Sequence, residues 1–237
     1  MSLFTEEDLK KIYAESEKIP DQTFWEIDER KAYSAKYFKK KNYSLFMSLA
    51  KYLGLFVLFF VVFFIVVNGP AIYKKTTYAV SPPSVNQSVI PKPIVNSAVS
   101  NLIIPKISVN APIIWDIAGE EITQNLENGV VHYKGTALPG NPGNVFITGH
   151  SSYYLWSPGS FKSVFAILDK LSSDDLIYIQ YKGINYTYKV TSQKIVGPDD
   201  VSVLEQTASD KMLTLMTCTP VGTNLQRLII IARQVSP

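Results

Sequence analysis

The sequence has few of the residues on which metal centres and disulfide frameworks depend. It contains one Cys and two His among 237 residues, which excludes a disulfide within the chain and a structural zinc site built from several thiolates. The net charge of +3, from 23 basic and 20 acidic side chains, provides no concentrated basic face for nucleic acid. The P-loop and G-x-G-x-x-G patterns are also missing from the sequence, so nucleotide chemistry has no support. We expect no cofactor and no nucleic-acid partner.

A long charge-free segment is present in the first third of the chain. No charged residue occurs from Tyr52 to Tyr73, and Leu53–Val67 consists almost entirely of Leu, Val, Phe and Ile. About 20 apolar residues at a rise of about 1.5 Å each can cross a hydrocarbon core of about 30 Å. A buried core helix and a cleavable signal peptide are the alternatives. Both are disfavoured, because lysines bracket the segment, no polar face interrupts it, and it begins some fifty residues into the chain. We predict a transmembrane signal anchor at 51–73.

The charges that flank this segment predict its orientation. Two lysines follow it closely, Lys74 and Lys75, whereas five precede it: Lys36, Lys39, Lys40, Lys41 and Lys51. Because the lysine-rich side of a membrane helix stays in the cytoplasm, residues 1–50 are expected to form a charged cytoplasmic segment. The chain is then a single-pass protein of the cell membrane with an extracytoplasmic C-terminal part.

Composition divides the exported part into a stalk and a folded domain. Residues 74–100 contain Pro82, Pro83, Pro91 and Pro93 among Ser, Asn and Val, which favours an extended stalk. Two short helices are expected in the remainder, at 122–129 and 161–171. Short β-rich runs between turn residues occupy 102–107, 111–115, 144–148, 176–181, 186–191, 213–217 and 228–232. Residues 101–237 are therefore predicted to form a mainly β domain, a closed barrel or a sandwich.

The only thiol of the chain, that of Cys218, stands at the end of a predicted strand. A lone Cys outside the cytoplasm is either a buried, inert side chain or a reactive group. Cys218 follows the strand 213–217 and precedes Thr219-Pro220. Catalytic groups are frequently found where a strand enters a loop, and this position favours the reactive interpretation.

Two further residues have side chains suited to acyl chemistry. His150 also follows a strand, and Gly149 beside it removes side-chain bulk, as a backbone approached by substrate would require. The other histidine, His132, is interpreted as a packing residue. Arg227 begins the last strand, so a hairpin returning from Cys218 would bring its guanidinium near the thiol.

These three residue types suit the cleavage of an amide bond. A thiolate is a strong nucleophile, and an imidazole can protonate the leaving amine and later deprotonate the incoming one. Charge that develops on the carbonyl oxygen needs preformed donors. The candidates are Arg227 and backbone N–H groups near Thr217 and Cys218, so Thr217 is assigned to the oxyanion region. The catalytic candidates are His150, Cys218 and Arg227.

Several motifs of the exported domain resemble one known family. Thr214-Leu-Met-Thr-Cys218 is followed by Thr219-Pro-Val-Gly-Thr223 and then by Arg227-Leu-Ile. Upstream, residues 135–144 and the Ile147-Thr-Gly-His150 motif precede them in order. This set resembles the signature of the sortases, bacterial cysteine transpeptidases, from about residue 102 to 232, and is most similar to class D. The anchor, the stalk and the exported domain also fit the layout of that family.

The resemblance implies an eight-stranded closed β-barrel with a few short helices, preceded by one transmembrane helix. Cys218 and Arg227 would lie on the strands that floor the groove, with His150 across from them. The implied reaction cleaves an L-P-x-T-G-like sorting signal of surface proteins through a thioacyl intermediate on Cys218. The acyl group then passes to an amine of the cell wall or of a pilin.

Two other functions stay open on the residues alone. One is a membrane-tethered cysteine peptidase that releases its substrate by hydrolysis, and the other is a non-catalytic envelope binding module. Calcium activation, known for some sortases, has no support, and no metal site is predicted. The acids are scattered and expected at the surface: Asp116, Glu120, Glu121, Asp174, Asp175, Asp199 and Asp200.

Overall fold

The computed structural model describes residues 5–16, 24–83, 100–154 and 156–237. It divides into two compact units, residues 1–62 and residues 63–237. The first unit contains helix α1 (Glu6–Ser16) and most of helix α2 (Phe24–Val80). Thr5 caps α1, since its hydroxyl accepts from the Asp8 N–H at 3.3 Å while the Asp8 carboxylate accepts from the Thr5 N–H at 3.1 Å.

Helix α2 includes the charge-free segment and continues past it. In the described part of the chain, Leu45–Val80 is the one helical stretch long and apolar enough to cross a membrane, with a mean hydropathy of 2.7 over its most apolar window. Pro70 lies inside this helix, where its ring supplies no N–H donor. Residues 74–80, expected in the extended stalk, are helical. They precede the prolines of the stalk, and most of the remaining stalk, 84–99, lies outside the described residues.

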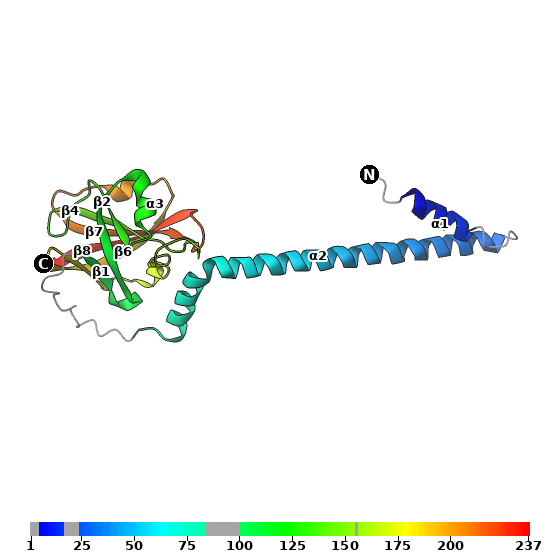
Figure 1. The fold of residues 1–237 in the computed structure, drawn as a ribbon, viewed down its shortest axis with the longest axis horizontal. Coiled ribbons are helices and arrows are strands. Elements are labelled where there is room, and N and C mark those ends of the chain that lie inside the picture. The colour runs from blue at the N-terminus through cyan, green and yellow to red at the C-terminus, as the bar shows by residue number, and fades with distance from the viewer. Residues whose placement is uncertain (1–4, 17–23, 84–99, 155) are drawn as a thin grey trace. The chain divides into compact units, whose positions relative to one another are not determined.

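The second unit is built on a closed barrel of eight strands (Figure 1). Around the barrel the order is β1-β2-β3-β4-β7-β8-β6-β5. Two neighbouring pairs, β2–β3 and β4–β7, are parallel, and the other pairs are antiparallel. The strands are β1 (Asn101–Ile104), β2 (Val109–Ile117), β3 (Val130–Tyr133), β4 (Gly143–Thr148), β5 (Leu176–Tyr181), β6 (Ile184–Val196), β7 (Lys211–Thr219) and β8 (Gln226–Ser236). The predicted mainly β, eight-stranded barrel is confirmed.

Aliphatic side chains on alternate strand positions form the core. Leu213 and Leu215 of β7 and Ile230 of β8 belong to the main cluster of buried residues. Ile229 faces the other way and packs in a second cluster with Phe146 of β4. Strand β8 is therefore covered on both faces, as its continuous apolar run predicts.

Several short elements differ from the prediction. Strand β3 was not predicted, and helix α3 (Ile122–Asn125) ends before residue 129. The helix predicted at 161–171 is wrong, because these residues form successive turns and the short 3₁₀ helix η3 (Leu168–Lys170). Phe165 donates its N–H to the carbonyl of His150 at 2.9 Å, which replaces the helical bond it would otherwise make. The other 3₁₀ helices are η1 (Pro105–Ile107), η2 (Gly119–Glu121) and η4 (Val201–Leu204).

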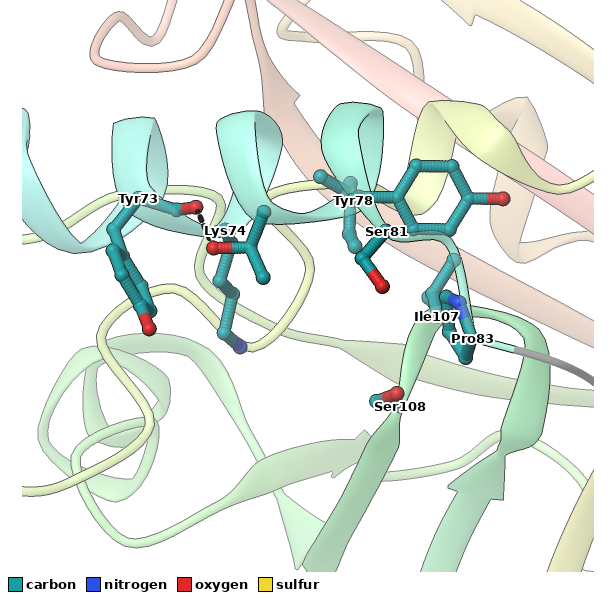
Figure 2. A pocket seen from close by; sticks show the side chains of 9 residues that line it. Tyr73, Lys74, Tyr78, Ser81, Pro83, Ile107 and Ser108 are labelled. Carbon is teal, nitrogen blue, oxygen red and sulfur yellow. Dashed lines mark hydrogen bonds between the residues drawn. The ribbon is translucent and has the colours of Figure 1, made fainter.

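The last turns of α2 pack on the barrel within the second unit. Figure 2 shows this end of the helix beside η1. A pocket of about 220 Å³ lies here, and its lining includes Tyr73, Lys74, Tyr78, Ile107 and Ser108.

Candidate active site

A pocket of about 470 Å³ brings together His150 and Cys218, two of the three catalytic candidates, whereas Arg227 is not among its lining residues. Its wall comes from the loop after β4, the β7–β8 hairpin, the region around α3, and α2. We call it the Cys218 pocket. It is lined by Val67, Asn68, Thr123, His150, Ser151, Ser152, Tyr153, Tyr154, Cys218, Gly222, Thr223 and Asn224.

The parallel pairing of β4 with β7 brings Cys218 and His150 to one edge of the barrel. The register joins Thr148 to Met216, so His150 and Cys218 each stand two residues beyond the same paired position. Neighbouring strands are about 4.8 Å apart. Imidazole and thiol therefore enter the pocket from adjacent strands, although 68 positions of sequence separate these residues.

Hydrogen bonds hold the ends of these two strands together. The N–H of Gly149 donates to the Met216 carbonyl at 3.1 Å, and the Thr217 hydroxyl donates to the Gly149 carbonyl at 2.8 Å. The Thr217 side chain is buried, at 3% exposure. Its hydroxyl thus links the strands, and only its backbone is left for the oxyanion region to which the sequence assigned it.

The His150 ring is half-buried and stacks on the ring of Tyr153, with centroids 4.4 Å apart and planes 17° from parallel. Nε2 of this ring is buried and has no hydrogen-bond partner in the described part of the chain. Burial lowers the pKa of His150 below its usual range, because the imidazolium loses hydration. The imidazole is therefore neutral at neutral pH, with a ring nitrogen able to take a proton.

Arg227 lies opposite Cys218 in the antiparallel pairing of β7 and β8. Directly paired residues point to the same face, with Cβ atoms about 5 Å apart. Nη1 of Arg227 donates to the carbonyls of Asn224 and Gln226 at 2.9 and 3.2 Å. The guanidinium is thereby held against the β7–β8 loop, next to the wall that Asn224 contributes. The expected return of this strand beside the thiol is confirmed.

Comparison with known proteins shows to which family the barrel belongs. Residues 102–235, more than half of the chain, match the family model described as a Sortase domain. The chain belongs to the sortase family. Members of this family are cysteine transpeptidases, and sortases are enzymes of the cell envelope.

Individual sortases resemble the chain at moderate identity. Sortase D of Bacillus subtilis is 30% identical over 148 residues, which cover 61% of this chain and 68% of that protein. Sortase A of Streptococcus agalactiae is 29% identical over 121 residues, 51% of this chain and 47% of that protein, so the chain spans about half of its length. A solved structure of Clostridium perfringens sortase C, described as containing the C-terminal cell wall sorting motif, has a TM-score of 0.50 at 27% identity and covers 58% of this chain and 70% of that one.

Gly149 is required in this sortase by packing beside His150. A Cβ on this residue would lie 2.6 Å from the Phe165 ring and 3.0 Å from Val164. The sequence analysis interpreted this glycine as making room for an approaching substrate. The space is instead filled by the segment after His150, which fixes the backbone of that residue.

The second histidine of the sortase, His132, lies on β3 with partners outside the Cys218 pocket. Its side chain is fully buried, with Nε2 3.0 Å from both the Ala137 carbonyl and the Thr136 hydroxyl. Nδ1 accepts from the N–H of Asp116 at 3.4 Å, and the Trp115 ring packs 4.9 Å away. Burial lowers the pKa of His132, although the Ala137 carbonyl and the Asp116 charge oppose the shift. These contacts agree with its interpretation as a packing residue.

The acids considered for calcium have other roles where contacts are resolved. Asp175 accepts from Lys106 at 2.7 Å, and Asp174 accepts from Lys189 at 2.7 Å. Asp200 caps η4 by accepting from the Ser202 N–H. Among the residues that the structure describes, no group of three or more His, Cys, Asp or Glu could hold a metal ion.

Among the residues of the pocket wall that the sequence analysis did not single out, one is a buried amide of α2. Asn68 of α2 is buried at 5% exposure, and its Oδ1 accepts from the Ser152 hydroxyl at 2.9 Å. A Cβ on Gly222 would lie 2.4 Å from the same Oδ1, so Asn68 fills the space between the loop after β4 and the β7–β8 hairpin. Its signal in the sequence was a polar residue that ends an otherwise apolar run.

Proposed function

We propose that this chain is a membrane-anchored sortase that cleaves an L-P-x-T-G-like sorting signal and transfers the acyl group to an amine. The observation that carries the proposal is the pairing of β4 with β7, which brings His150 and Cys218 into the wall of one pocket. The sorting motif described for the Clostridium perfringens sortase C structure supports the substrate class.

In the first half-reaction, Cys218 passes its proton to the neutral imidazole of His150 and attacks the carbonyl carbon between Thr and Gly of the signal. A C–S bond forms and the carbonyl oxygen becomes negatively charged. The C–N bond then breaks, and the imidazolium gives its proton to the leaving amine. The acyl part of the substrate remains on Cys218 as a thioester.

In the second half-reaction, an amine of the cell wall or of a pilin attacks the thioester. His150 takes the proton that the amine loses, a C–N bond forms, and the C–S bond breaks. The proton returns to the Cys218 sulfur, which restores the thiol. Water in place of the amine gives hydrolysis, so the transfer reaction depends on which nucleophile reaches the pocket first.

Arg227 is the proposed donor to the negative carbonyl oxygen in both halves. Nη1 already donates to the carbonyls of Asn224 and Gln226, which fixes the orientation of the guanidinium before substrate arrives. The other donors of its planar fork are assigned to the oxyanion, together with the backbone N–H groups around Thr217 and Cys218. Preorganised donors of this kind contribute about 10²–10³ in rate each.

The apolar stretch of α2 supports an anchor at 51–73, with residues 1–50 in the cytoplasm and the catalytic domain 101–237 outside. Residues 74–100 connect the anchor to the domain.

Incubation of the full chain in detergent with an L-P-x-T-G peptide and a glycine amine tests this function. Mass spectrometry is expected to find the acyl fragment on Cys218 and an amide product that joins it to the amine. The Cys218→Ala variant should give neither species. An acyl-enzyme on that variant would refute the nucleophile assignment, and a free acid as the only product with the parent chain would favour the peptidase.

A further inference from the structure

A row of aromatic rings leads from the Cys218 pocket to the protein surface. The His150 ring stacks on Tyr153, the centroids of Tyr153 and Tyr154 are 5.3 Å apart, and Tyr154 stacks on Trp156 at 5.1 Å and 17°. Exposure rises along the row to 49% for Tyr154 and 67% for Trp156. Large exposed aromatic side chains that are already ordered against one another indicate a contact surface.

The loop that carries these rings, residues 152–154 and 156–163, is fastened to α2 near both of its ends. We call it the aromatic loop. The Ser152 hydroxyl donates to Asn68 at 2.9 Å, and Nζ of Lys74 donates to the Ser163 carbonyl at 2.8 Å. Asn68 directly follows the apolar run Phe63–Val67, and Lys74 is the first charged residue after it. The aromatic loop therefore lies beside the part of α2 where the charge-free segment ends.

Its composition suits the boundary between lipid and water. Tyr and Trp concentrate there, because their rings are apolar and each carries one polar group. The sequence from His150 to Leu168 contains no acidic residue and one lysine, Lys162, so it offers no charge that anionic headgroups repel.

We propose that the aromatic loop is a membrane-docking surface, with Tyr154 and Trp156 inserted among the lipid headgroups around α2. Its partner is the lipid of the same membrane that anchors the chain, and the inference rests on the anchor proposed above. Because Tyr153 and Tyr154 also line the Cys218 pocket, docking holds the pocket mouth at the membrane surface. A substrate that is itself tethered to the membrane meets the pocket there.

Fluorescence quenching in vesicles tests the docking directly. The full chain is reconstituted into phosphatidylcholine–phosphatidylglycerol vesicles that carry a nitroxide near the glycerol of the lipid. The chain has three Trp, so the Trp156 signal is taken as the difference between the parent chain and Trp156→Phe. We expect nitroxide lipid to quench this difference signal strongly and acrylamide in the water to quench it weakly.

A tryptophan at the far end of β8 provides the matched control. Val235 is 56% exposed and lies eight positions beyond Arg227 on the same strand, about 26 Å away. The extra signal of Val235→Trp should respond to acrylamide and not to the lipid nitroxide. A Trp156 signal that behaves like this control, in chains shown by flotation to be inserted, overturns the docking while leaving the proposed function intact. Failure of the chain to insert at all overturns both the anchor and the docking.

Kinetics separates lipid docking from peptide binding by the same rings. Trp156→Ser, on a ring outside the lining of the Cys218 pocket, is expected to raise KM for a lipid-tethered sorting peptide about fivefold, with KM for the soluble peptide unchanged. An equal rise for both peptides would assign the rings to the peptide groove and overturn the proposal.

Discussion

Removal of the Thr217 hydroxyl tests how the two catalytic candidates are held together. This hydroxyl donates to the Gly149 carbonyl at 2.8 Å in a buried position, one residue before each candidate. Thr217→Val keeps the shape of the side chain and leaves the carbonyl without this donor. An unsatisfied buried acceptor costs about 1–3 kcal/mol, which lowers the melting temperature of a domain of this size by several degrees.

The effect on catalysis is expected to exceed the effect on folding. The bond joins the strand end that carries His150 to the one that carries Cys218, so its loss loosens their alignment. Misplacement of reacting groups by about 1 Å can reduce the rate by about 100-fold. We expect kcat to fall between about 10- and 100-fold with KM unchanged, because a side chain with 3% exposure does not reach the peptide.

Two further variants make this test decisive. Thr217→Ser restores the hydroxyl and should recover most of kcat. Thr148→Val removes another hydroxyl that links β4 to β7, one that donates to the Met216 carbonyl at 3.3 Å, and should reduce stability with little loss of kcat. If Thr217→Val and Thr148→Val have the same melting temperature and the same kcat, Thr217 has no positioning role.

Three other predictions follow from the site. His150→Ala should reduce turnover about 10²–10⁴-fold, whereas His132→Gln should retain most of it, and the reverse result, measured as amide product per enzyme, would exchange their roles. Arg227→Lys should lower kcat about 10²–10³-fold, because lysine lacks the planar fork of donors. Arg233→Lys is the control, since Arg233 is an exposed β8 side chain that pairs with Asp210, and it should keep the kinetics of the parent chain. Equal kinetics for the two variants would make Arg227 a structural residue. Burial lowers the pKa of both histidines in the folded chain, so the unfolded chain binds protons more tightly than the folded one. The free energy of unfolding should therefore fall as the pH is lowered from about 6.5 to 5. A melting temperature that rises as the pH is lowered over this range would contradict the burial argument.

Local sequence patterns predicted most strands of the barrel, because a strand depends mainly on the residue types within it and on the turn residues at its ends. β-branched and aromatic runs between turn residues located seven of the strands, and the pairing of Cys218 with Arg227 follows from a hairpin with a short loop. The helix prediction for residues 161–171 was wrong because the apolar residues of this segment recur at every third position as well as at helical spacing. Successive turns with bonds three residues apart, such as Leu168 N–H to the Phe165 carbonyl at 3.1 Å, bury the same side chains.

The spacing of residues along the sequence could not predict that Cys218 and His150 line the same pocket. Their strands pair in parallel, and nothing in either strand specifies the other as its neighbour, so only resemblance to a family could bring them together before the structure was known. His132 shows the difference, since the sequence alone assigned it to packing, and the contacts of β3 agree with that assignment.

The contribution of α2 to the pocket has a physical reason that also lay beyond the sequence. In an apolar helix, a lone polar side chain such as Asn68 must find a partner, and within its own helix it reaches only the Phe64 carbonyl, at 3.1 Å. The amide oxygen is satisfied by Ser152, which is 84 positions away in the chain. That bond fixes the loop after His150 to α2. The residue that ends the apolar run thus also joins α2 to the candidate active site.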